Sequence, residues 1–167
     1  MDNTNQHGRE FRHVDENVIK FRKLRLLDEE DVQTCDCRSN TAEGDICHQD
    51  TTCSNRGTRV ECLIGFCSKA RCQNMRLQKK QKLPLKVIDA GCKGRGLVAM
   101  EPIKTGTMLS EYTGEVIPTS EYKRRMELYA AAGGHFYVMG LPNAEYLDAA
   151  RYGNEMRFMN HSCTPNA

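Results

Sequence analysis

Seven cysteines crowd into residues 35–72, and this block constrains the fold more than any other feature of the chain. Large apolar residues such as Leu63 and Phe66 are few there, and Gly, Ser, Thr, Asn, Asp and Arg predominate. A segment of this composition cannot bury enough apolar surface to hold itself together. It therefore needs covalent or metal cross-links.

Thiolate–zinc bonding is the favoured cross-link, because disulfide pairing alone would leave one of seven thiols over. Seven thiolates can serve two tetrahedral zinc ions if one sulfur bridges both. Chain order predicts one ion among Cys35, Cys37, Cys47 and Cys53, a second completed by Cys62, Cys67 and Cys72, and Cys47 as the shared sulfur. The alternative is a disulfide-rich secreted module, which is disfavoured because the sequence opens without a secretory signal.

Composition limits the remaining function classes. Hydrophobic residues make up 39% of the 167 residues and Trp is absent, so the apolar core is modest. The sequence has no apolar run of the ~18 residues that a membrane-spanning helix needs. The formal net charge is only +2, so a nucleic-acid site must be sought in local basic patches.

We expect three parts: an N-terminal strap or tail at 1–30, a zinc-binding module at 31–82 and a third domain at 83–167. In the first part, Val14, Val18 and Phe21 suggest a weak helical stripe, so a strap against the folded part and a partner-binding helix are equal alternatives. A basic segment follows the cysteines, with Lys69, Arg71, Arg76, Lys79, Lys80, Lys82 and Lys86. It suits either a phosphate backbone or an exposed helix face.

From residue 85 onward the pattern changes to short strands and turns, which predicts a mostly β domain with a few short helices. The expected strands are residues 85–88, 97–100, 108–112, 115–117, 136–139 and 145–147. A helix capped by Thr119 and ended by the glycine pair at 133–134 carries Tyr122, Met126 and Tyr129 on one face. The glycine-rich turn at 91–96 is, by itself, an ordinary hairpin turn rather than a nucleotide fingerprint.

The last residues of the sequence resemble a known family signature. Arg157-Phe158-Met159-Asn160-His161-Ser162-Cys163 closely resembles the signature of SET-domain protein lysine methyltransferases. Four further motifs match in order, at 93–97, 111–116, 135–137 and 147–154, and the cysteine block followed by Gln73-Asn74 resembles the AWS zinc module. The resemblance covers about residues 31–167. It implies a SET-domain β-fold preceded by an AWS zinc knot, and the residues at 135–137 are similar to the NSD-type branch.

The resemblance implies S-adenosylmethionine as methyl donor and a lysine of histone H3, typically lysine thirty-six, as acceptor. It also implies a nuclear, chromosomal location and two partners, the histone H3 tail and nucleosomal DNA, with no membrane. The alternative function is a non-catalytic, zinc-bound chromatin module that grips DNA through the basic segment.

The family's cofactor contacts carry over to Lys93, Gly94, Arg95, His135, Phe136, Tyr137, Asn160 and His161. Asn154 and Arg157 would be architectural and fix the loop that carries Asn160. Tyr112 and Tyr137 are the catalytic candidates. Their aromatic rings suit the alkyl stem of a substrate lysine. Desolvation between them would lower the pKa of that lysine and so favour its neutral amine.

The sequence departs from the family pattern at its end. Family members continue with a strand carrying a further tyrosine and with a cysteine-rich post-SET segment, whose cysteines would join Cys163 on a third zinc. We therefore expect the 167-residue chain alone to bind cofactor weakly and to methylate poorly. Cys92 has no expected role.

Overall fold

The computed structural model describes residues 10–24, 28–35, 37, 47, 53–67, 72–133 and 136–166. They divide into two compact units. The sheet unit comprises Met1–Leu24, Pro84–Thr105 and Glu111–Ala167, and the cysteine unit comprises Arg25–Leu83 and Gly106–Ser110. Short strands predominate over short helices, which confirms the predicted fold class.

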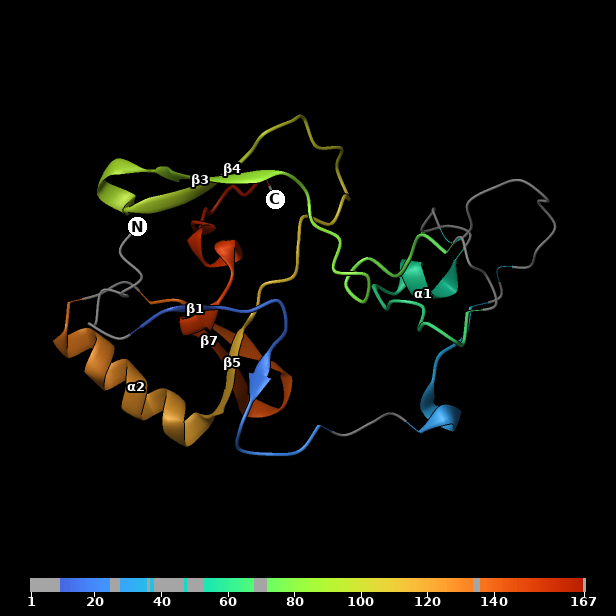
Figure 1. Ribbon diagram of the computed structural model, residues 1–167, viewed down its shortest axis with the longest axis horizontal. Helices are drawn as coiled ribbons and strands as arrows, with labels where there is room; N and C mark the ends of the chain where they lie inside the picture. The colour runs from blue at the N-terminus through green and yellow to red at the C-terminus, as the bar shows by residue number, and fades with distance from the viewer. Residues whose placement is uncertain are drawn as a thin grey trace. The chain divides into compact units, whose positions relative to one another are not determined.

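Two antiparallel strands form the centre of the sheet unit, β5 (Gly114–Pro118) and the nine-residue β7 (Glu145–Gly153). The strand β6 (Val138–Leu141) adds to β7 across the turn at 142–144, as the sequence predicted. A separate two-stranded sheet pairs β3 (Leu85–Asp89) with β4 (Arg95–Ala99). Figure 1 shows β1, β7 and β5 side by side.

The N-terminal segment forms part of the sheet instead of a helix. Its strands β1 (Arg12–His13) and β2 (Val18–Ile19) pair in parallel with β7 and β5, giving the order β1-β7-β5-β2. The alternative of a helix in this segment is therefore wrong, because its backbone amides and carbonyls pair with strands β7 and β5. A strap against the folded part describes the segment correctly.

The apolar core of the sheet unit lies along β5 and β7, where Val116, Ile117, Leu147, Ala149 and Ala150 are buried. Small residues let the two strands approach closely at one end. Gly114 pairs with Gly153, and a Cβ atom added to Gly114 would lie 2.9 Å from the carbonyl oxygen of Asp148. Glycine is therefore required by space at this position.

One helix, α2 (Thr119–Ala131), follows β5 directly. The predicted cap at Thr119 is wrong: Thr119 is the first helical residue, and its hydroxyl donates to the carbonyl of Ala144 at 2.7 Å. Gly133, with φ of 63°, follows the helix end in the left-handed conformation that glycine favours. Tyr122, on the predicted face, stacks on Tyr146 of β7 with ring centroids 3.8 Å apart.

In the part of the cysteine unit that the structure describes, the regular elements are α1 (Ser54–Gly57) and a single helical turn at Glu29–Asp31. Among its described residues, the buried hydrophobic ones are Cys47, Cys53, Cys62, Cys72 and Met75, so sulfur takes the place of an aliphatic core. The predicted strand at 108–112 is wrong, because the amide of Leu83 bonds to the carbonyl of Leu109 without extending into a ladder. No helix in the described ranges has the length and apolar character to cross a bilayer.

The close approach at Gly114 gives a stability prediction. Gly114→Ala places a methyl group against the backbone of β7, which cannot yield without moving a strand, so we expect a loss of ~1–3 kcal/mol in unfolding free energy. Urea unfolding followed by circular dichroism measures the loss. Gly140→Ala in β6 is the matched control, because nothing lies within 4 Å of its added Cβ. Equal stability of the two variants would contradict the packing account.

Candidate functional site

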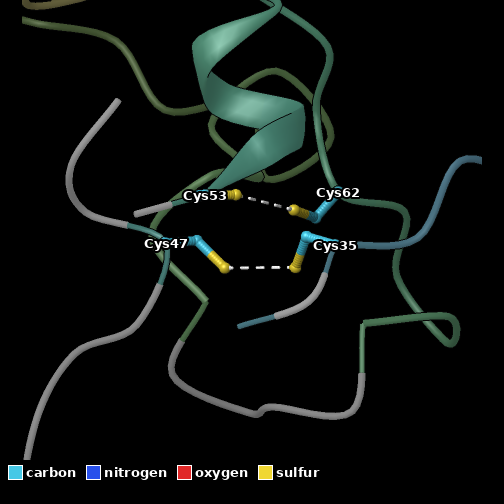
Figure 2. A group of neighbouring side chains, drawn as sticks. All are labelled: Cys35, Cys47, Cys53 and Cys62. Atoms are coloured by element: carbon cyan, nitrogen blue, oxygen red, sulfur yellow. Dashed lines mark hydrogen bonds between the residues drawn. The ribbon is translucent and has the colours of Figure 1, made fainter. Parts of the chain in front are cut away.

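The seven cysteines of residues 35–72 gather around one buried cluster of sulfur atoms. Figure 2 shows the side chains of Cys35, Cys47, Cys53 and Cys62 pointing toward one another. A second group consists of Cys47, Cys62, Cys67 and Cys72, and within each group the sulfur atoms all lie within 4.8 Å of one another. None of the nine cysteines forms a disulfide.

The spacing of these sulfurs fits a tetrahedral thiolate site. The Sγ atoms of Cys35 and Cys47 lie 3.6 Å apart, and those of Cys53 and Cys62 lie 4.0 Å apart. A tetrahedron with Zn–S bonds of ~2.3 Å has sulfur–sulfur edges of about 3.8 Å. The donor set and its geometry therefore suit a soft or borderline metal such as zinc.

The grouping agrees with chain order for one set and differs for the other. The second predicted set, Cys62, Cys67 and Cys72 with Cys47 shared, is one of the two groups found. The first group found contains Cys62 where chain order predicted Cys37. Cys37 nevertheless packs against the cluster, and its thiol interacts with Cys47 and Cys53. Cys47 belongs to both groups, as does Cys62.

Burial and crowding govern the acidity of these thiols. Desolvation raises the pKa of Cys47 and Cys72, and it raises the pKa of Cys37 and of Cys62 to about 11. Burial also acts against ionisation of Cys35, but hydrogen bonds from the Cys37 backbone and from neighbouring thiols lower its pKa to about 7. Several thiolates this close together need a cation to neutralise their charge.

Two asparagines support the cluster, and sequence reasoning missed their role. The side-chain amides of Asn55 and Asn74 point their Nδ2 atoms at the sulfur of Cys62, at 3.7 and 3.5 Å. Asn55 is fully buried, and the same amide donates to the carbonyl of Gln33 at 2.8 Å. Neutral donors of this kind hold a ligand side chain in place and stabilise negative charge on sulfur.

The residues predicted to line the cofactor come from two segments that meet. Asn160 donates from Nδ2 to the carbonyl of Arg95 at 3.2 Å, so the signature segment lies against the β3–β4 hairpin. A Cβ atom added to Gly96 would lie 3.3 Å from that Asn160 nitrogen and 3.1 Å from Cβ of Ala90. Gly94 adopts φ of 72°, which turns the hairpin back on itself. Glycine thus leaves room for close backbone approach at this turn.

The other predicted cofactor residues are less tightly grouped. Lys93 ends the short helical turn Gly91–Lys93 before Gly94. Phe136 is half exposed and lies beside Tyr129 of α2, with ring centroids 6.5 Å apart. His161 is exposed and lies 3.8 Å from the Cys163 sulfur. The prediction at His135 falls outside the described residues.

Tyr112 and Tyr137, the predicted catalytic pair, both interact with a buried arginine. The guanidinium carbon of Arg157 lies 4.0 Å from the ring centroid of Tyr137, and Arg157 also interacts electrostatically with Tyr112. Burial raises the pKa of Tyr112 to about 12, with the charges of Arg157 and Asp148 acting in opposite directions. The Tyr112 phenol is therefore neutral at physiological pH.

Aromatic rings enclose the rest of the Arg157 guanidinium. Phe11 of the N-terminal segment lies 4.3 Å from it and Phe158 lies 5.2 Å from it, while Nη1 donates to the carbonyl of Ala150. Burial lowers the pKa of Arg157, but a guanidinium stays charged at neutral pH. Sequence reasoning expected an architectural role for Arg157 and missed that it is a fixed cation next to both tyrosines.

Asn154, the other residue expected to be architectural, bonds at two places. Its Oδ1 accepts from the amide of Met156 and caps the short turn Glu155–Phe158, and its Nδ2 donates to the carbonyl of Glu111 at 2.7 Å. Cys163 and Cys92 are exposed, and neither belongs to a metal-binding group among the described residues.

Known proteins resemble this chain in sequence and in fold. Residues 94–167 match the family model described as SET domain. A relative from Saccharomyces cerevisiae, "Histone-lysine N-methyltransferase, H3 lysine-36 specific", is 36% identical over 94% of this chain and 22% of its own length. "Histone-lysine N-methyltransferase ASHH1" of Arabidopsis thaliana is 36% identical over 94% of this chain and 32% of its own length.

An Aspergillus fumigatus relative, also named H3 lysine-36 specific, is 41% identical over 82% of this chain and 15% of its own length. A chain in the crystal structure of an active polycomb repressive complex 2 in the basal state aligns with a TM-score of 0.63 and 26% identity, over 79% of this chain and 20% of that one. Residues 94–167 therefore form a SET domain, and the chain is similar to proteins named histone-lysine N-methyltransferases. It spans between 15% and 32% of the three curated relatives.

The environments of the tyrosines lead to a titration experiment. Burial favours the neutral phenol, so Tyr112 should ionise only near pH 12, whereas the Lys20 ammonium lowers the pKa of the partly exposed Tyr152 below its usual 10. Tyrosine-selective carbon-13 NMR, with Tyr→Phe variants for assignment, measures both values. Titration of Tyr112 together with or before Tyr152 would contradict this account of the site.

Proposed function

We propose that this protein transfers a methyl group from S-adenosylmethionine to a lysine of histone H3, with lysine thirty-six as the acceptor. The observation that carries the proposal is identity of 36% across 94% of the chain to relatives named histone-lysine N-methyltransferases, one of them H3 lysine-36 specific. The SET domain at residues 94–167 supports the same activity.

The meeting of Asn160 with the β3–β4 hairpin supports the proposed cofactor site. Gly96 lets the Asn160 side chain approach the hairpin closely, and the Asn160 amide donates to the carbonyl of Arg95. S-adenosylmethionine, when bound, supplies an electrophilic methyl group on a sulfonium. Lys93, Gly94, Arg95, Asn160 and His161 would hold it, with His135, Phe136 and Tyr137 as its side wall.

Tyr112, Tyr137 and Arg157 would together favour the neutral form of the substrate lysine amine. A lysine that enters beside Tyr112 and Tyr137 is flanked by aromatic rings, which suit its alkyl stem. Its amine must be neutral to act as a nucleophile, although free lysine has a pKa of ~10.4. Desolvation and the fixed positive charge of Arg157, 4.0 Å from the Tyr137 ring, both disfavour the ammonium form. Alignment of the neutral amine then supplies most of the rate acceleration.

We propose further that the cysteine cluster binds two zinc ions as an AWS module at residues 31–82, which a SET domain at 83–167 follows in the sequence. Seven sulfurs fill eight tetrahedral positions when one of them bridges, and Cys47 lies in both groups found. A third zinc at Cys163 would need ligands from a post-SET segment.

Nucleosomal DNA is the second partner that we propose, in the nucleus and on chromosomes. The side chains of Lys79, Lys80 and Lys82 are exposed, as contact with phosphates requires. Lys69 and Arg71 of the same basic segment lie outside the described residues.

Methyl transfer to recombinant nucleosomes tests the activity. Full-length protein should methylate wild-type H3, and turnover should disappear when H3 lysine thirty-six is replaced by alanine. Asn160→Ala should weaken cofactor binding at least tenfold by calorimetry, because its amide both contacts the Arg95 carbonyl and faces the proposed cofactor. Asn143→Gly, which removes an exposed amide at φ of 61°, is the matched control. DNA binding without cofactor binding would favour the non-catalytic module.

Metal content tests the zinc proposal independently. Elemental analysis of natively purified protein should find two zinc ions per AWS module. Cys47→Ser should lower the content by at least one, whereas Cys92→Ser, in an exposed turn, should leave it unchanged. Because ligand thiols must lose their protons, the apparent zinc affinity should fall as the pH is lowered. Full zinc content in Cys47→Ser would rule out the shared-sulfur arrangement.

A further inference from the structure

The segment that carries Tyr112 is held in place without belonging to a strand. Residues 111–113 precede β5 and have no ladder partner, although the side chain of Thr113 is buried. The backbone position of this segment therefore depends on individual hydrogen bonds. On one side, Asn154 donates to the carbonyl of Glu111 at 2.7 Å.

The N-terminal segment bonds to residues on both sides of Tyr112. Asn17 donates from Nδ2 to the Glu111 carboxylate at 3.1 Å and accepts from the Gly114 amide at 3.0 Å. Its single side chain therefore spans Tyr112. The Thr113 hydroxyl adds a third bond, donated to the carbonyl of Val14 at 2.8 Å.

Two further contacts keep this N-terminal segment, residues 10–24, in register with the site. The Lys20 ammonium lies 3.0 Å from the Glu115 carboxylate, immediately after the bonded Gly114. Phe11 covers the guanidinium of Arg157, the same cation that contacts Tyr137. Residues almost a hundred positions away in sequence thus touch the surroundings of both predicted catalytic tyrosines.

We infer that Asn17 of the N-terminal segment is a positioning residue for the methyl-transfer site, because its side-chain amide holds the Glu111 carboxylate before Tyr112 and the Gly114 backbone amide after it. This inference rests on the proposed function, because it assigns to Asn17 an effect on that reaction. Loss of the Asn17 side chain leaves the rest of the sheet intact but lets residues 111–114 shift. Misplacement of an aligned group lowers turnover more than it lowers binding.

Asn17→Ala in the full-length protein tests the inference. We expect kcat to fall roughly fivefold, as the loss of two hydrogen bonds allows, with little change in KM for cofactor or in melting temperature. Leu24→Ala, at a 69% exposed position of the same segment, is the control and should match wild type.

A polarity swap distinguishes positioning from a general loss of stability. Asn17→Asp keeps the acceptor for Gly114 but sets two carboxylates against each other, so its kcat should fall as well. Adding Glu111→Gln restores a donor–acceptor pair in reverse, and the double variant should recover most of the wild-type kcat. Thr113→Val, which removes the bond to Val14 with little change of shape, should lower kcat independently.

The outcomes separate the two proposals. If wild-type protein methylates and Asn17→Ala has wild-type kcat, the positioning role is wrong while the proposed function stands. If wild-type protein has no turnover, the proposed function fails, and the carbon-13 resonance of Tyr112 still reports on the segment. A single unshifted Tyr112 resonance in Asn17→Ala would then overturn the positioning role, and a shifted or doubled one would support it.

Discussion

The sheet unit depends on a carboxylate with no exposed surface, that of Asp148 in β7. A buried charge of this kind is tolerated only when partners satisfy each oxygen. Oδ1 accepts from the amide of Ala150, while Oδ2 accepts from Arg125 and from the Tyr129 hydroxyl at 2.8 and 2.7 Å. Both side-chain donors belong to α2, so satisfying Asp148 fixes that helix against the sheet.

The same network links α2 to the proposed site. Arg125 also contacts Glu115 of β5 and Glu121 of its own helix, which hold its pKa far above the usual value in spite of burial. Tyr129, bonded to Asp148, lies beside Phe136, and the neighbouring Ala149 amide bonds to the Tyr137 carbonyl. Buried networks of charges often contribute little net stability, because apolar residues can replace them without loss. The effect of this network that matters here is geometric: it fixes the position of α2 relative to Tyr137.

Local pattern predicted β3, β5, the β6–β7 hairpin and the course of α2, because each depends on neighbours in the sequence. It also placed Cys62, Cys67 and Cys72 in one set with Cys47, since closely spaced cysteines offer few alternatives. It failed for the N-terminal strands, whose partners lie about a hundred residues away and leave no periodic trace. Asn17 and Asn55 were missed for the same reason: the sequence does not show whether the side chain of an asparagine faces water or hydrogen-bonds to a distant segment. Asp148 was noticed within a motif, but nothing in its spacing indicated Arg125 as a partner.

The two units compensate for a small apolar core in different ways, and this difference determines how the stability of each depends on bound metal. The sheet unit closes its strands with glycine contacts and a neutralised set of charges, none of which needs an added ion. The cysteine unit has sulfur at its centre, and burial raises the pKa of several of those thiols, so a bound cation would favour their ionised form. Loss of the proposed zinc would therefore affect the cysteine unit first, because the contacts described for Tyr137 and Arg157 come from residues of the sheet unit.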